Sequence, residues 1–315
     1  MEKQLQFELW QECNSKCTFC YLGRGNNIVA DAIKIANMNN AIRILSNPKT
    51  FEVYDTISFI GGEFFQGQIN SQSVRDKFFE LMQLTANLLN QNIIKNVWIY
   101  ATLTIGNQKD LYETLELFKP SIDRFWLLTS YDTLGRFHTK KMEDNWSYHM
   151  KNIHNLYPTI KFNITTIITG DLIEKYLNNT FSFKHLINEY HSALFIKLCA
   201  GPEGMYSSKE ETNADLGNFF PKRGEFIKFL TKFKKEESPD LYDKLFNIQY
   251  RADTLYCEYK GKLEQISRDK DTILETYDSE IDHIMDCGHL SIYNCYIDSD
   301  KCALCDKLKM DKLSV

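Results

Sequence analysis

Six short β-rich runs alternate with longer amphipathic runs along the first two hundred residues. The β-rich runs are enriched in Ile, Val, Phe, Trp and Thr and cover residues 5–11, 53–60, 96–102, 124–129, 161–168 and 193–199. Between them, apolar residues at three- and four-residue spacing predict helices over residues 28–45, 74–89, 111–118, 142–156 and 172–190. Strands that alternate with helices favour a parallel sheet with right-handed crossovers, so the sequence predicts an α/β fold.

The pattern changes after Cys199, which predicts a boundary near residue 200. Residues 200–217 are rich in Gly, Pro, Ser, Asn and acidic residues without an apolar period, which is typical of a loop. Helices are expected over 225–233 and 241–250, with a break at Ser238 and Pro239. The chain of 315 residues therefore divides into a core over 1–200, a helical linker region over 201–250 and a cysteine-rich extension over 251–315.

Charge and cysteine content exclude several classes of protein. A net charge of -5 disfavours a protein that tracks nucleic-acid phosphates, although a small basic groove or a nucleotide substrate is not excluded. No apolar signal segment precedes Gln4 and no apolar run reaches 18 residues, so neither secretion nor a membrane span is expected. The nine cysteines are therefore interpreted as reduced thiols and metal ligands of a cytoplasmic protein.

Three cysteines directly follow the first β-rich run. Cys13, Cys17 and Cys20 have the spacing C-x3-C-x2-C, which lets one tight loop direct three thiolates at one point. Thiolates favour zinc, copper(I) or iron–sulfur centres, and a complete protein-held 4Fe-4S cluster takes four cysteines. Three cysteines suit a cluster with one open iron. The alternatives are a structural zinc site completed by a distant His or Cys, and plain reduced thiols.

The second β-rich run ends in Gly61-Gly62-Glu63. Two glycines let the backbone pass close to a ligand because no Cβ intervenes, and a carboxylate at that point can accept from an ammonium group. The carboxyl ends of parallel strands meet at one edge of the sheet, which is where such folds hold their chemistry. Alone, this tripeptide is compatible with an ordinary turn.

The three-cysteine loop and the Gly-Gly-Glu strand end together resemble the radical S-adenosylmethionine (radical SAM) superfamily. The resemblance implies a partial (β/α)6 TIM-like barrel with a 4Fe-4S cluster on Cys13, Cys17 and Cys20. In that family the amino and carboxylate groups of S-adenosylmethionine chelate the open iron. The resemblance places Phe19 near the adenine, and it assigns Gly61, Gly62 and Glu63 to the methionyl amino group.

Two further positions follow from the same resemblance. Ser130, at the end of the fourth β-rich run, is expected to contact the ribose or the carboxylate of S-adenosylmethionine. Residues 166–174 resemble the family's G-x-I-x-G-x-x-E, which implies that Ile168 contacts the adenine. The match is imperfect because Thr166 replaces the first glycine and the acid falls one position late at Glu174. Asp171 and Glu174 are more simply explained as a helix start.

The loop after the fourth run carries Arg136 and His138, which could bind a substrate carboxylate or phosphate. A solvated loop is the simpler interpretation of both, and no residue is assigned a catalytic role.

The resemblance implies an enzyme that reductively cleaves S-adenosylmethionine to methionine and a 5'-deoxyadenosyl radical, which abstracts hydrogen from a substrate. The expected partners are a one-electron donor such as flavodoxin or ferredoxin and a peptide, protein or small-molecule substrate. One alternative is a non-catalytic iron–sulfur or zinc protein for electron transfer or partner binding. Another is an activating enzyme that installs a radical on a partner protein.

The extension holds a second group of cysteines with the spacing C-x7-C-x6-C-x2-C. Four thiolates this close in sequence can surround one metal; they are Cys287, Cys295, Cys302 and Cys305. The extension resembles the shortened auxiliary-cluster (twitch-like or SPASM-like) regions of some radical SAM enzymes. Either a second 4Fe-4S cluster or zinc is expected, with His283, His289 or Cys257 as substitute ligands.

Overall fold

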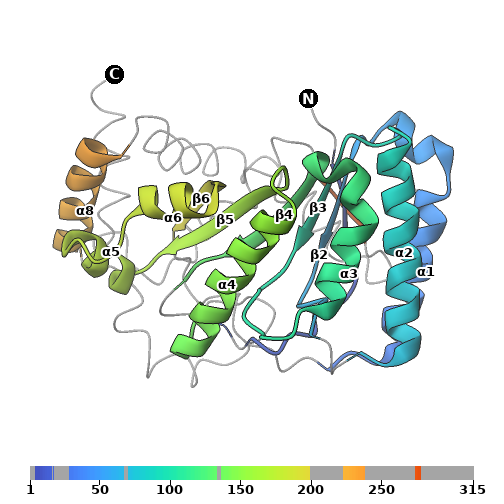
Figure 1. Ribbon diagram of the computed structural model, residues 1–315, viewed down its shortest axis with the longest axis horizontal. Helices are drawn as coiled ribbons and strands as arrows, with labels where there is room; N and C mark the ends of the chain where they lie inside the picture. The colour runs from blue at the N-terminus through green and yellow to red at the C-terminus, as the bar shows by residue number, and fades with distance from the viewer. Residues whose placement is uncertain are drawn as a thin grey trace.

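The computed structural model describes residues 4–15, 17, 28–66, 70–132, 136–198, 223–237 and 274–277. Six parallel strands alternate with helices, so the predicted α/β class with a parallel sheet is confirmed. The strands are β1 (Gln4–Glu8), β2 (Thr56–Ile60), β3 (Asn96–Tyr100), β4 (Phe125–Ser130), β5 (Lys161–Ile168) and β6 (Ser192–Leu198). They lie side by side in chain order from β1 to β6 (Figure 1).

The helices occupy the predicted crossovers with one difference. They are α1 (Asp31–Leu45), α2 (Gln72–Asn90), α3 (Lys109–Phe118), α4 (Lys140–Leu156), α5 (Gly170–Leu177), α6 (Phe183–Tyr190) and α8 (Arg223–Glu236), with 3-10 turns η1 (Pro48–Glu52) and η2 (Lys119–Arg124). The single helix expected over 172–190 is wrong. Asn179 has a left-handed backbone with φ of 58°, and the Ser182 side chain caps a new helix by accepting from the backbone N–H of His185, so the segment forms α5 and α6.

One face of the sheet is apolar and packs against helices. Consecutive strands that are neighbours and joined by right-handed crossovers place their helices on the same side. On that side Phe7 and Phe59 stack with ring centroids 5.7 Å apart, and both belong to the buried core that also contains Met38 and Leu45 of α1. The same alternation buries Ile99, Leu127 and Ile164 of the other strands.

The opposite face, here called the polar face, carries the alternate residues of the same strands. Most of its members are hydrophilic or amphipathic, namely Gln4, Gln6, Glu8, Thr56, Ser58, Asn96, Trp98, Tyr100, Trp126, Ser130, Lys161, Asn163 and Thr165. Its apolar members are Ile60, Leu128, Ile167, Ala193 and Phe195. Contacts across neighbouring strands support this placement: Ser58 Oγ donates to Gln6 Oε1 at 3.4 Å, and the Trp98 and Trp126 rings are 5.8 Å apart. Several of these side chains are half-buried where their neighbours on the apolar face are fully buried.

Segments beyond residue 200 also contact the core. Strand β7 (Leu274–Tyr277), from the predicted extension, pairs antiparallel with β1. Helix α8, from the predicted linker region, packs on α5 (Figure 1). Its Phe229 and Phe233 are buried beside Tyr176. The helix expected over 241–250 lies outside the described residues. None of the helices in the described ranges combines the length and apolar character that a bilayer crossing requires.

Candidate functional site

The three-cysteine loop and the Gly-Gly-Glu turn meet at the carboxyl ends of β1 and β2. The two strands are parallel neighbours in which Glu8 lies opposite Ile60. Backbone pairing continues past both strand ends, because the N–H of Gly62 donates to Trp10 O at 2.7 Å and the N–H of Glu63 donates to Glu12 O at 2.9 Å. The Gly-Gly-Glu turn, about fifty residues further along the chain, is therefore in direct backbone contact with the residues that immediately precede Cys13.

The glycines are required by this backbone contact. A Cβ on Gly62 would lie 1.9 Å from Glu12 O, and a Cβ on Gly61 would lie 2.2 Å from Trp10 O. Real Cβ atoms do not approach a backbone oxygen so closely, so both positions need glycine. In the structure both glycines make room for the chain that leads into Cys13, and their expected contact with a ligand stays a prediction.

Two of the three predicted cluster ligands lie together behind this contact. Cys13 is half-buried, Cys17 is buried, and the N–H of Ser15 donates to Cys13 Sγ at 3.4 Å. Burial, with a further contribution from the charge of Glu63, raises the pKa of the Cys13 thiol to about 12, so metal binding has to displace a proton.

The third predicted ligand, Cys20, and the aromatic residue Phe19 lie outside the described residues. Among the residues that are described, no three His, Cys, Asp or Glu side chains are grouped to hold a metal ion. The donors that are described nevertheless fit an iron–sulfur centre. Two thiols of one loop lie close enough to interact electrostatically, and one of them already accepts a backbone N–H.

A buried ion pair, here called the stem clamp, fixes the two ends of the cysteine-containing segment. Glu12 Oε2 accepts from the N–H of Val29 at 3.0 Å and from Lys34 Nζ at 2.9 Å. The side chains of Lys34 and Glu12 are only 1% and 9% exposed, and Lys34 also donates to Asn70 Oδ1 at 3.2 Å. The clamp therefore joins the chain immediately before Cys13 to the start of α1.

Sequence reasoning missed the stem clamp, although a signal was present. Lys34 occupies the same buried stripe of α1 as Met38, Ala41 and Leu45. A lysine in such a stripe requires a carboxylate partner, because an unpaired buried ammonium group is strongly disfavoured. Asn37 of the same helix donates to Leu9 O at 2.7 Å, so α1 holds the exit of β1 at two points.

Glu63 is fully buried and ties the glycine turn to the end of β3. Its Oε1 accepts from the N–H of Phe65 at 2.9 Å and its Oε2 from the N–H of Thr102 at 2.5 Å. Burial raises the pKa of Glu63, while the hydrogen bonds from Thr102 and Phe65 and the charge of Arg136 oppose that rise. Both carboxylate oxygens already accept one hydrogen bond, so the predicted contact with an ammonium group would use a second lone pair of one of them.

Ser130 and Ile168 lie on opposite faces of the sheet. Ser130 ends β4 on the polar face, half-buried and opposite Thr165 of β5. Ile168 is fully buried in the apolar core, on the same side as Ile164, so the expected contact between its side chain and adenine does not agree with its position. Strand alternation turns the half-buried Ile167 to the polar face instead.

The acids after β5 behave as the simpler interpretation predicted. Thr169 caps α5 by accepting from the N–H of Leu172 at 3.2 Å, and Asp171 lies in the first helical turn, 2.7 Å from Lys175 Nζ.

In the loop after β4, His138 is exposed. Arg136, by contrast, is half-buried and near enough to Glu63 to lower the pKa of that carboxyl group.

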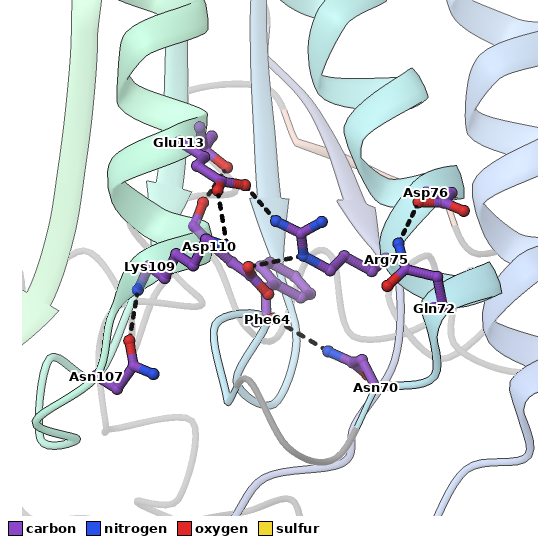
Figure 2. Close-up of polar contacts among 10 residues, drawn as sticks. Phe64, Asn70, Gln72, Arg75, Asp76, Asn107, Lys109, Asp110 and Glu113 are labelled. Atoms are coloured by element: carbon purple, nitrogen blue, oxygen red, sulfur yellow. Dashed lines mark hydrogen bonds and ion pairs between the residues drawn. The ribbon is translucent and has the colours of Figure 1, made fainter.

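A pocket of about 360 Å³ opens beside the cysteine loop. The residues around it include Asn14, Phe65, Gln66, Arg75, Asn107 and Asp110. Figure 2 shows Arg75 of α2 directed toward two acids of α3: its Nε donates to Asp110 Oδ1 at 2.8 Å, and its guanidinium also pairs with Glu113. Two carboxylates thus neutralise Arg75, and the network joins the first turns of α2 and α3.

The predicted second metal site lies outside the described residues. This applies to Cys287, Cys295, Cys302 and Cys305 and to the substitute ligands His283, His289 and Cys257. That site stays a prediction.

A comparison with known protein families finds no family model that matches this chain, and a comparison with curated proteins finds no match either.

Proposed function

We propose that this protein is a radical SAM enzyme. The observation that carries the proposal is the backbone contact between the Gly-Gly-Glu turn and the residues that lead into Cys13, at adjoining ends of parallel strands. A structural zinc knuckle has no need of a glycine-glycine-acid turn docked against it. Three thiolates of one loop beside such a turn suit a cluster that leaves one iron for an outside ligand.

Several residues have assigned roles in this proposal. Cys13, Cys17 and Cys20 would hold the 4Fe-4S cluster, which with S-adenosylmethionine supplies the reductive cleavage that yields methionine and a 5'-deoxyadenosyl radical. Glu63 orients the turn through Phe65 and Thr102 and offers its remaining lone pairs to the methionyl amino group.

The remaining contacts to S-adenosylmethionine come from strand ends and from the cysteine loop. Ser130 is proposed for the ribose or carboxylate, and Phe19 for the adenine. Ile167 replaces Ile168 as the apolar contact from β5, because it shares the face that carries Ser130. The chain's contribution is to orient the cofactor and to exclude water around it.

The proposal extends to the shape of the sheet and to the partners. We propose that the six parallel strands curve as a partial (β/α)6 barrel whose interior is the polar face, with a second 4Fe-4S cluster or zinc in the extension. The electron donor is a flavodoxin or ferredoxin, and the substrate is a peptide, a protein or a small molecule. A reducing cytoplasmic location follows, since the thiols must stay free to bind iron.

The test is anaerobic loading with iron and sulfide, followed by reduction in the presence of S-adenosylmethionine. Wild-type protein is expected to form 5'-deoxyadenosine and methionine, whereas Cys17→Ala loses both products and the iron of the core site. Circular dichroism should show the same fold in both proteins, and Cys199→Ala is the control for a cysteine outside both motifs. Absence of both products from wild-type protein with an intact cluster would refute the enzyme and favour a non-catalytic iron–sulfur protein.

The extension is tested with a variant in which Cys13, Cys17 and Cys20 are all replaced by alanine. About four irons remaining per chain would support an auxiliary 4Fe-4S cluster. One zinc without iron would indicate a structural zinc site, and the absence of both metals would remove the site.

A further inference from the structure

The composition of the polar face is unusual for a parallel sheet. Parallel strands are commonly covered on both faces and read as continuous apolar runs, and the interiors of closed (β/α) barrels are filled mainly by Val, Ile and Leu. Here the alternation is strict enough that β1 reads Gln-Leu-Gln-Phe-Glu and β5 begins Lys-Phe-Asn-Ile-Thr. Polar residues kept on one face of such a sheet indicate a surface that meets polar groups.

The register of the strands arranges this face in rows. Gln6, Ser58, Trp98, Trp126 and Lys161 form one row, since each lies opposite the next on the neighbouring strand. Within that row the polar groups have partners: Gln6 with Ser58, and Lys161 Nζ 5.1 Å from the Trp126 ring centroid.

The next row, nearer the cysteine loop, contains Glu8, Ile60, Tyr100, Leu128 and Asn163. Glu8 lies opposite Ile60, and Leu128 lies opposite both Tyr100 and Asn163. This row adjoins the glycine turn, because its member Ile60 directly precedes Gly61.

Hydrogen-bonding groups in and beside this row lack partners. Glu8 Oε1 and Asn163 Oδ1, both acceptors, and Trp98 Nε1, a donor from the adjacent row, are buried atoms without a hydrogen-bond partner. Among the residues that the structure describes, no lysine, arginine or histidine pairs with Glu8, and the Gln11 side chain supplies a hydrogen bond to the carboxylate. Burial raises the pKa of Glu8, because the carboxylate loses its hydration. A cation beside Glu8 would stabilise the ionised carboxylate again.

A ligand with N–H donors could form hydrogen bonds with the two acceptor atoms that lack a partner, Glu8 Oε1 and Asn163 Oδ1. A carboxylate forms its strongest hydrogen bonds with charged donors, and a protonated amine or guanidinium supplies both the charge and the N–H groups. An amide oxygen such as Asn163 Oδ1 accepts equally well from an amide N–H. The surplus of acceptors over donors excludes a carboxylate or phosphate as the group that faces Glu8, because two anions would repel each other.

We propose that Glu8 and Asn163 select the substrate, and that the substrate carries a protonated amine or guanidinium group, as in a lysine or arginine side chain of a peptide. The inference rests on the proposed radical SAM function for the reaction and on the proposed curvature of the sheet for the binding. Glu8 on β1 and Asn163 on β5 are four strand spacings, about 19 Å, apart along the sheet, so one substrate residue reaches both only across the interior of a barrel. Glu8 receives the cationic group, Asn163 accepts an N–H from the substrate, and the Trp98 indole donates to a substrate carbonyl. The row lies next to the cysteine loop, which brings such a substrate to the end of the sheet where the cluster is proposed.

The preference is measurable without catalysis. Nα-acetyl-lysine amide is titrated into the full chain, and binding is followed by tryptophan emission, with Trp98→Phe identifying the contribution of the polar face. Nα-acetyl-norleucine amide has the same amides without the ammonium group, and n-butylamine has the ammonium group without the amides. The lysine probe is expected to bind about tenfold more tightly than the norleucine probe, the effect of one hydrogen bond to a charged group.

The variants assign the preference to its residues. Glu8→Gln is nearly isosteric and is expected to abolish the preference for lysine over norleucine, whereas Glu52→Gln, at an exposed position, leaves it unchanged. Asn163→Ala is expected to weaken both amide probes and to leave n-butylamine unaffected, which separates a peptide side chain from a free amine. Circular dichroism shows whether each variant is folded.

Three results would overturn the inference: equal binding of the lysine and norleucine probes to wild type, retention of the preference in Glu8→Gln, or loss of S-adenosylmethionine binding in Glu8→Gln with the lysine preference intact. The last would mean that Glu8 holds the cofactor. Failure of the proposed function would give a different result: the protein would form no 5'-deoxyadenosine, while it would still bind the lysine probe more tightly than the norleucine probe.

Discussion

Replacing Lys34 by methionine removes the cation of the stem clamp and keeps most of the side-chain volume. In the wild type, Lys34 Nζ lies 2.9 Å from Glu12 Oε2 and 3.2 Å from Asn70 Oδ1. After the substitution, Glu12 Oε2 retains the backbone N–H of Val29 as its partner. A carboxylate that is 9% exposed is then left without a counter-charge.

The expected loss follows from burial of both groups. Removing one member of a buried ion pair costs about 3–5 kcal/mol, because the other charge stays desolvated and unpaired. The pair of Lys95 and Asp55 is the matched control, since its ammonium and carboxylate are 2.7 Å apart but the Lys95 side chain is 69% exposed. Lys95→Met is expected to cost about 1 kcal/mol or less.

The assay is urea unfolding of wild type, Lys34→Met, Lys95→Met and Lys34→Met combined with Glu12→Gln, followed by circular dichroism and fluorescence. The double variant should recover part of the loss, because it removes the uncompensated charge. If Lys34→Met lowers the free energy of unfolding no more than Lys95→Met does, the clamp does not stabilise the fold and the argument from burial is refuted.

Two further predictions concern a glycine and a buried histidine. Gly62→Ala places a methyl group 1.9 Å from Glu12 O, so we expect a loss of about 2–3 kcal/mol in urea unfolding and poorer iron retention after loading. Gly106→Ala, whose nearest neighbour would be 3.7 Å away, is the control, and equal behaviour of the two variants would contradict the steric argument. Burial lowers the pKa of His149 from 6.5, so the unfolded chain takes up a proton at a higher pH than the folded one. The stability contributed by neutral His149 is therefore present above about pH 6.5 and is lost as the pH falls below it, and His149→Gln should flatten the decline in urea midpoint between pH 7 and pH 5.5; an unchanged slope would count against it.

The sheet was predictable because its strands are rich in Ile, Val, Phe, Trp and Thr and alternate with amphipathic helical runs. The predicted run over 161–168 coincides with β5, and the other predicted strands overlap theirs with small errors at the ends. The break between α5 and α6 was missed because it depends on the left-handed backbone of Asn179 and the cap at Ser182, which interrupt an otherwise continuous apolar stripe. Strand β7 was missed because its four residues carry no distinctive pattern and join the sheet through backbone pairing with β1.

The candidate site was predictable where local spacing carries the chemistry and not where distant residues converge. The cysteine loop and the Gly-Gly-Glu turn are local, so they could be recognised from sequence. The contact of the Glu63 carboxylate with Thr102 joins two strand ends and is set only by packing. Ile168 illustrates a third limit, since a shift of one residue in a strand changes the face, and the buried side chain of Ile168 lies on the face opposite that of Ser130.

The stem clamp also determines how far the length of the cysteine-containing segment can change without disturbing the sheet. Glu12 and Val29 are joined by one hydrogen bond, so the residues between them form a closed loop whose ends are fixed independently of its length. The entropy of closing a loop grows only logarithmically, by about 0.6 kcal/mol for each doubling. Insertions or deletions between Cys20 and Val29 should therefore leave the sheet nearly unaffected, so this stretch can be redesigned in length as long as Glu12 and Lys34 are kept.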